Sequence, residues 1–160
     1  MNNRVIDALN DARSHELTAV AQYMIHHYEL EDKMYGKLAD VLKRIAIVEM
    51  KHAEEFAERI LFLGGVATSK PYVPAESGIK KQQSIPELLQ NDIGLESDAI
   101  HLYNDLAKVC ADEGDHVSEL LFQRIADVEE DHLDEFQNIN DFVDKLGAPY
   151  LASLTGESEG

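Results

Sequence analysis

Cysteine, long apolar runs and basic residues are all scarce in this sequence. Cys110 is its single cysteine, which excludes an internal disulfide and any metal site built on paired thiolates. No apolar run approaches the roughly 18 residues of a membrane-spanning helix, and the opening Met1–Asp7 has no apolar core of a secretory signal. We therefore expect a cytoplasmic protein with no membrane partner.

The charge balance is strongly acidic. Thirty-one acidic residues outweigh 14 basic ones, for a net charge of −17. This balance argues against nucleic acid and against an anionic membrane surface as partners. It is compatible with attraction of cations, and equally with a solvated acidic surface whose role is solubility.

Helical periodicity dominates the chain. Apolar residues recur with a 3.6-residue period over about 4–33, 35–63, 84–111 and 115–146, and a short apolar run follows at 148–154. A length of 160 residues suits one domain, 1–160. The fold class is therefore predicted to be all-α, with a short fifth helix that must pack on something, such as another subunit. The last residues, 155–160, are interpreted as a frayed tail.

One long loop separates the two predicted helical hairpins. It covers 64–83 and contains Gly64, Gly65, Pro71, Pro74 and Gly78. Some 20 extended residues reach about 60 Å, whereas a helix of 27 residues is about 40 Å long. The loop can therefore cross the full length of a bundle, which predicts the single long crossover of ferritin-like four-helix bundles.

One set of metal-ligating residue types is written twice along the chain. Each copy has a Glu-x-x-His segment, a second glutamate 33 residues before it, and a tyrosine seven residues after that second glutamate. Each ligand candidate lies within an apolar stripe and not on a charged face. The copies are Glu16, Tyr23, Glu49 and His52, and Glu96, Tyr103, Glu129 and His132.

The Glu-x-x-His spacing alone is a weak signal, since composition predicts roughly 0.7 occurrences in this chain. A third occurrence, Glu113 to His116, contains Gly114 and has Lys80 in place of the upstream glutamate. We interpret it as a turn. The repeated upstream glutamate and tyrosine are what single out the other two.

Antiparallel hairpins place residues that are symmetric about a turn at the same height. Glu16 should therefore lie beside Glu49, and Glu96 beside Glu129. Four buried carboxylates repel one another, and two divalent ions would neutralise them. This ligand set is known from di-iron and di-manganese bundles, and oxygen-rich ligation suits iron or manganese. Glu49 and Glu129 would bridge, while Glu16 with His52 and Glu96 with His132 would complete the two ions. The alternative is a buried ion-pair network without metal.

Three further residues are candidates for supporting the ligands. Tyr23 and Tyr103 lie two turns from Glu16 and Glu96, and are either hydrogen-bond donors to the ligands or ordinary core residues. Asp92, one turn before Glu96, is either a residue that orients a ligand histidine or part of a solvated face.

Two segments resemble bacterioferritins: Asn10–Tyr23 and Glu49–Leu63. The resemblance extends over essentially the whole chain. In that family the methionine directly after the first bridging glutamate, here Met50, is an axial ligand of haem at the two-fold interface between subunits. Met50 lies about 100° around the helix from Glu49 and so faces away from the metal site. The residues expected to share its face are Leu17, Ala21, Met24 and Ile47.

The resemblance implies a homo-oligomer of 24 subunits, built as a hollow shell from two-fold dimers that each share one haem. It implies two irons per subunit, ferroxidase activity on Fe(II) with O2 or H2O2, storage of ferric mineral, and haem-assisted iron release with a ferredoxin-type reductant. There is one departure. Arg44 and Val48 stand where some relatives carry His and Asp for an extra iron site on the inner surface.

Two other classes of function were weighed. A di-iron oxidase or peroxidase of the rubrerythrin kind would turn over without storing mineral, but its usual partner domain needs a cysteine quartet. A non-catalytic helical interaction module leaves the six ligand candidates unexplained. Particle mass separates a shell of roughly 430 kDa from a dimer of roughly 36 kDa.

Overall fold

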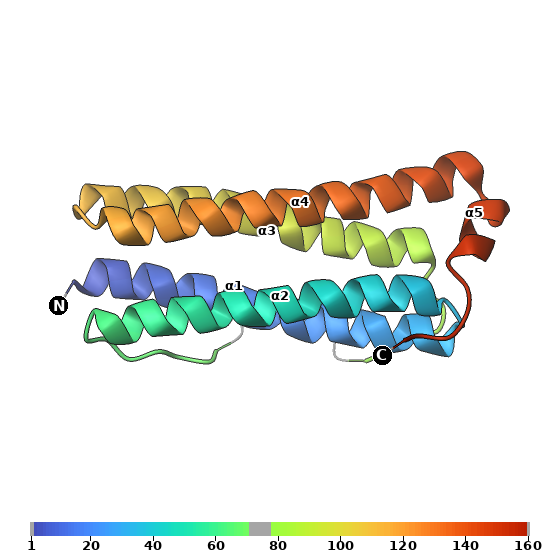
Figure 1. The fold of residues 1–160 in the computed structure, drawn as a ribbon, viewed down its shortest axis with the longest axis horizontal. Helices are drawn as coiled ribbons and strands as arrows, with labels where there is room; N and C mark the ends of the chain where they lie inside the picture. The colour runs from blue at the N-terminus through green and yellow to red at the C-terminus, as the bar shows by residue number, and fades with distance from the viewer. Residues whose placement is uncertain (1, 71–77, 160) are drawn as a thin grey trace.

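Four long helices and one short helix make up the computed structural model, which describes residues 2–70 and 78–159 (Figure 1). Their bounds differ by at most one residue from the predicted ranges, and the all-α bundle is confirmed. Within the described residues, no helix is long and apolar enough to cross a membrane. The helices are α1 (Asn3–Asp32), α2 (Gly36–Phe62), α3 (Ile85–Asp112), α4 (His116–Leu146) and α5 (Ala148–Ser153).

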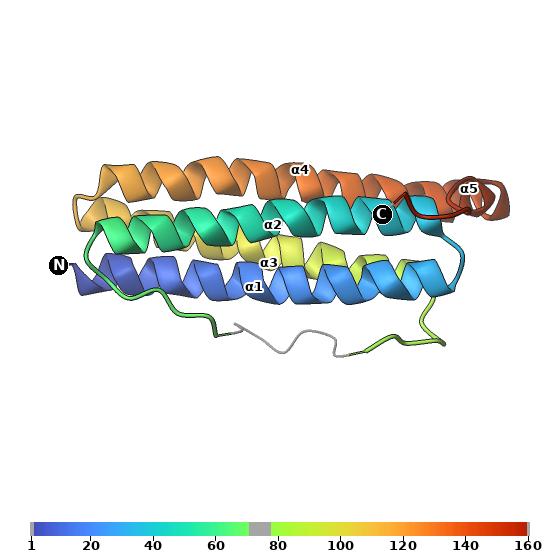
Figure 2. The same cartoon turned by 60° about the horizontal axis from the view of Figure 1, so that its bottom comes forward.

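The helices form two hairpins, α1 with α2 and α3 with α4, which pack along their lengths. The two described flanks of the connection leave α2 at one end of the bundle and reach α3 at the other (Figure 2). The middle of the predicted crossover, 71–77, lies outside the described residues and includes Pro71 and Pro74. Across the hairpins, the backbone of α1 approaches that of α3, whereas α2 and α4 stay farther apart and meet through side chains such as Phe56 and Phe122.

Local sequence signals explain where the helices begin. Ser84 caps α3 through a reciprocal capping box with Glu87, and a proline stands in the first turn. Asn2 and Asp115 accept hydrogen bonds from the first free N–H groups of α1 and α4. The turn into α4 contains Gly114, which has a φ of +75°, a conformation that glycine adopts without steric cost.

The core is divided into two apolar clusters by a layer of buried polar side chains. One cluster contains Leu9, Phe56 and Phe122, and the other contains Leu42 and Phe136. The polar layer consists of the predicted ligands, which the helices carry at mid-length. The apolar clusters above and below it hold the helices at the separation that the polar layer requires.

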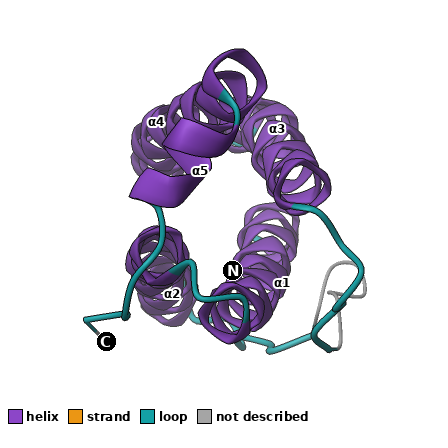
Figure 3. Cartoon of the chain, turned by 90° about the vertical axis from the view of Figure 1, so that its right-hand side faces the viewer, coloured by secondary structure: helices purple, strands orange, loops and turns teal. Residues whose placement is uncertain are grey.

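Residues 155–159 pack against the start of α2, so the prediction of a frayed tail is wrong for them. Helix α5 lies across one end of the bundle (Figure 3), and the chain then returns to the start of α2. Gly36 N–H donates to the Gly156 carbonyl at 3.0 Å, and Lys37 N–H donates to the Leu154 carbonyl at 3.2 Å. The N-cap of α2, Tyr35, makes no side-chain cap. The tail is ordered because its carbonyls satisfy these otherwise free N–H groups.

Candidate dinuclear metal centre

The six side chains predicted as ligands meet inside the bundle. Helices α1 and α3 each contribute one glutamate, and α2 and α4 each contribute a glutamate and a histidine one turn apart. One turn of helix brings Glu and His at i and i+3 to the same face, which is why each short motif supplies two groups. The four glutamates are at most 1% exposed, and the histidines 5% and 6%.

These side chains form two overlapping groups, in each of which the ligand atoms lie within 4.8 Å of one another. The groups share Glu49 and Glu129. A carboxylate common to both groups would offer one oxygen to each of two ions, as a bridging ligand does. The first group is Glu16, Glu49, His52 and Glu129, and the second is Glu49, Glu96, Glu129 and His132.

Each imidazole reaches a carboxylate of the other hairpin. His52 Nδ1 lies 3.0 Å from Glu129 Oε1, and His132 Nδ1 lies 2.7 Å from Glu49 Oε1. Nδ1 of each histidine also lies 3.5 Å from a non-shared glutamate, Glu16 for His52 and Glu96 for His132. Both Nδ1 atoms therefore point into the cluster, where an ion would lie.

Burial and crowding shift the acidities in the cluster. Burial, and then the neighbouring carboxylates, raise the pKa of Glu49 well above its usual range. Burial and Glu129 raise the pKa of Glu96 to about 8. Burial acts to lower the pKa of both imidazoles. Their hydrogen bonds to carboxylates outweigh this effect and raise the pKa of His52 to about 9 and that of His132 to about 10. Burial acts to raise the pKa of Glu129 as well, but hydrogen bonds from its neighbours leave it lowered.

The donor set fits two divalent cations. Without them the cluster must retain protons on carboxyl and imidazole groups to limit repulsion. The buried Oε2 of Glu96 also receives no hydrogen bond within the described part of the chain, although buried carboxylate oxygens are nearly always paired. A cation beside Glu96 would satisfy this oxygen and replace the retained protons.

A pH dependence follows for the metal-free protein. The pKa values of Glu96, His52 and His132 are raised on folding, so the stability they contribute is present at low pH and is lost as pH rises through the folded values. Glu129 has a lowered pKa, so it stays ionised above neutral pH and causes no further change in stability there. We expect the melting temperature of the metal-stripped protein to fall by roughly 5 °C or more between pH 7 and 10.

The check is calorimetry across that pH range with and without two equivalents of a divalent ion. Bound metal replaces the protons, so the metal-loaded protein should lack this fall. A flat profile for the metal-free protein would mean that the cluster does not hold the predicted protons.

The two tyrosines support the ligands in a crossed pattern. Tyr103 donates its hydroxyl proton to Glu16 at 2.6 Å, and Tyr23 donates to Glu96 at 2.7 Å. Both side chains are fully buried, and burial first, with nearby carboxylates, raises both phenol pKa values well above 10.0. They therefore remain protonated donors. Each tyrosine holds the glutamate of the opposite hairpin, which links the two halves at the cluster.

Asp92 is fully buried and contacts two side chains of α1. It lies 2.8 Å from Nδ1 of His26 and accepts a hydrogen bond from Gln22 at 3.0 Å. Since His26 is not a ligand candidate, these contacts leave the orientation of a ligand histidine by Asp92 a prediction, whereas its full burial excludes the other interpretation, a solvated face. Sequence reasoning assigned no role to His26. Its pairing with Asp92 joins α1 to α3, a relation that no spacing along the chain reveals.

Met50 lies on the surface of α2, away from the cluster. Its side chain is 50% exposed, and Ile47 beside it is 41% exposed. Of the other residues predicted for this face, Ala21 is exposed while Leu17 and Met24 are partly buried. The α1–α2 hairpin thus carries an exposed thioether with apolar neighbours on its outer side.

Comparisons with known proteins agree with this geometry. A family model described as a ferritin-like domain matches residues 6–145. The bacterioferritin of Desulfovibrio desulfuricans is 43% identical over 153 residues, which cover 96% of this chain and 83% of that protein. The bacterioferritin of Brucella melitensis is 35% identical over 151 residues, covering 94% and 91% of the respective chains.

Solved structures show the same fold. The Desulfovibrio desulfuricans bacterioferritin, described with its diiron site in different catalytic states, superposes with a TM-score of 0.88 at 41% identity and covers 100% of this chain and 95% of its own. The Rhodobacter capsulatus bacterioferritin, described with a metal-free dinuclear site and haem iron, gives a TM-score of 0.90 at 32% identity, with coverage of 100% and 98%.

Proposed function

This chain belongs to the bacterioferritin family, and from that premise we propose that it stores iron and oxidises Fe(II) at the cluster of six ligands. The observation that carries the proposal is the pair of overlapping ligand groups that share Glu49 and Glu129. A site for a single ion would need only one of these two ligand groups. A buried, acidic, oxygen-rich donor set with one imidazole per ion is suited to iron.

The residues have separate tasks in this proposal. Glu49 and Glu129 would bridge two ions, with Glu16 and His52 on one and Glu96 and His132 on the other. Bound iron would supply the one-electron redox chemistry that converts Fe(II) to Fe(III), with O2 or H2O2 as the acceptor. The surrounding apolar clusters exclude bulk water, and the crossed tyrosine bonds fix the rotamers of the two terminal glutamates. The protons held by Glu49, Glu96 and the imidazoles leave when cations enter.

Met50 is proposed as an axial ligand of haem. Its half-exposed side chain and its apolar neighbours suit a flat apolar group held between two copies of the chain. Each subunit offers one such methionine, so a two-fold dimer would share one haem. The haem would pass electrons inward for iron release, with a ferredoxin-type protein as the reductant.

The single domain would assemble as a hollow shell of 24 subunits that encloses ferric mineral. The exposed apolar side chains of the described helices, among them Phe62, Val117 and Leu120, give this subunit surface to bury against neighbours. An excess of acidic residues lends the shell affinity for Fe(II).

Stepwise aerobic addition of Fe(II) to the purified, metal-stripped protein tests the proposal. We expect rapid oxidation of the first two irons per chain, followed by continued uptake far beyond two, in a particle of roughly 430 kDa. Saturation at two irons would identify a di-iron oxidase that stores nothing. Absence of uptake would mean that the cluster is a structural polar network and not an iron site.

A further inference from the structure

The two Glu-x-x-His segments are alike beyond their ligands. Each carries an arginine five residues before its glutamate and a second glutamate three residues after its histidine. None of these four residues belongs to the ligand groups. They are Arg44 and Glu55 on α2 and Arg124 and Glu135 on α4.

The structure pairs these residues across the hairpins. Arg44 donates to Glu135, and Arg124 donates to both carboxylate oxygens of Glu55, at 3.1 Å and 3.5 Å. Each pair joins α2 to α4. At 1.5 Å per residue, Arg44 lies about 8 Å from Glu49 along α2 in one direction, and Glu55 about 9 Å in the other. The two ion pairs therefore stand on either side of the metal centre.

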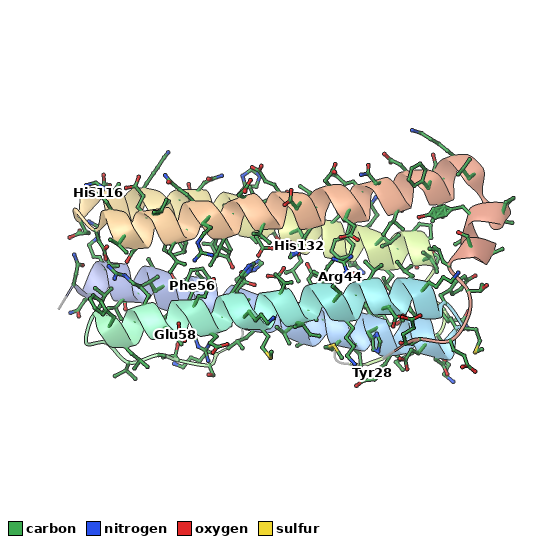
Figure 4. The ribbon with its side chains drawn as sticks, in the orientation of Figure 1. Tyr28, Arg44, Phe56, Glu58, His116 and His132 are labelled. Carbon is green, nitrogen blue, oxygen red and sulfur yellow. The ribbon has the colours of Figure 1, made fainter. Side chains whose placement is uncertain are left out.

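The least buried of the six ligand candidates belong to the same two helices. They are the histidines of α2 and α4, His52 and His132, which are 5% and 6% exposed. Figure 4 shows Arg44 and His132 projecting into the space between α2 and α4. We call the strip between α2 and α4 that contains the two imidazoles and is flanked by the two ion pairs the α2–α4 seam.

The two pairs are poorly suited to a purely structural role. Both arginine side chains are 55% exposed, and Glu135 and Glu55 are 33% and 37% exposed. Ion pairs this exposed contribute little to stability and open without unfolding the protein. They do, however, place one cationic and one anionic group on each side of the two least buried ligand candidates.

We propose that the pairs Arg44–Glu135 and Arg124–Glu55 form a gate for divalent cations at the α2–α4 seam. In the closed gate, each guanidinium is hydrogen-bonded to the carboxylate of its partner. An arriving cation takes that carboxylate as a transient ligand, the guanidinium swings away into solvent, and the ion passes on to the histidine and glutamates within. This inference rests on the proposed function, since it requires a metal centre behind the gate.

Co(II) binding to the assembled, metal-stripped protein tests the gate without any oxidation step. The visible absorbance of bound Co(II), followed by stopped flow at low ionic strength, reports the rate of entry. Removing both positive charges, as Arg44→Gln with Arg124→Gln, should speed entry about threefold, because each charge repels the cation at close range. Removing both negative charges, as Glu55→Gln with Glu135→Gln, should slow entry about threefold.

Opposite signs are the decisive result. Both double variants break the same two ion pairs, so a purely structural role moves both rates in the same direction, and that outcome would overturn the gate. Arg4→Gln and Glu113→Gln are the matched controls, since they alter another arginine–glutamate pair, at the far end of α1, and should leave entry unchanged.

The final amount of bound Co(II) distinguishes failure of the proposed gate from failure of the proposed metal centre. Two Co(II) per chain in every variant, with equal entry rates, would refute the gate while leaving the metal centre standing. No Co(II) bound by the unaltered protein would refute both.

Discussion

Replacing Glu49 with glutamine should lower the rate of Fe(II) oxidation by at least about a hundredfold, since loss of residues that merely support a ligand already costs 10–100-fold. Glu49 lies in both ligand groups, so the substitution removes a ligand from both ions at once. Stopped-flow absorbance after addition of two Fe(II) per chain measures the effect. Assembly should be unaffected, because the side chain keeps its size and remains buried.

The same substitution should stabilise the metal-free protein. Burial and three neighbouring carboxylates raise the pKa of Glu49, so its ionised form is costly in the absence of metal. Glutamine fixes the neutral state. The melting temperature of the metal-stripped variant should therefore exceed that of the unaltered protein, with a gain that grows above pH 8. Function and stability would move in opposite directions, as expected for a site whose strain metal binding relieves.

Glu54→Gln is the control for both measurements. Glu54 lies on the same helix but is exposed, so its substitution should alter neither the oxidation rate nor the melting temperature. Oxidation at the unaltered rate in Glu49→Gln would show that Glu49 is not a ligand, and with it the bridging role would fall.

Replacing Met50 with leucine should reduce haem content from about one per two chains to near zero, because leucine offers no atom to the axial position of the iron. Haem absorbance after reconstitution and removal of excess haem measures this. Oxidation of the first two Fe(II) per chain should remain within about twofold of the unaltered protein, since Met50 is half exposed on the outer side of α2 and faces away from the ligands.

Met24→Leu is the matched control for the haem experiment. Met24 belongs to the same predicted face but is partly buried, and leucine preserves its packing, so haem content should be retained. Haem bound normally by Met50→Leu would mean that another residue supplies the axial ligand. Loss of haem from Met24→Leu alone would move the ligand to α1.

The clustering of the six side chains was predictable from sequence because each short motif is local. Glu49 and His52 lie one turn apart on one helix, so their spacing guarantees a common face wherever that helix packs. The helix ends were predictable for a similar reason, since Ser84, Gly114 and Asp115 act on backbone groups within a few residues.

Relations between hairpins were not predictable in the same way. Tyr103 was expected near the cluster, but its partner is Glu16 of the other hairpin. Asp92 meets His26, a contact that its position in the sequence did not indicate. Each residue was on the predicted side of its helix, while the residue opposite it was unknown.

The conformation of the C-terminal tail was likewise not predictable from the sequence. Its composition suggested fraying, and no signal in 155–160 marks a partner. The order arises because the start of α2 offers N–H groups that its own N-cap, Tyr35, leaves without a side-chain acceptor. The tail can satisfy them only after α5 has turned across the end of the bundle.

Sequence by itself therefore determined the helices, the faces they bury and the six side chains that would hold two ions. Tertiary structure alone decided which residues meet across the hairpins: the crossed tyrosines, the Asp92–His26 pair, and the partners of Arg44 and Arg124 at the seam. Helical periodicity states the direction in which a side chain leaves its own helix. The partner it meets depends on the rotation and axial offset of the neighbouring helix, which the packing of the whole core sets at once.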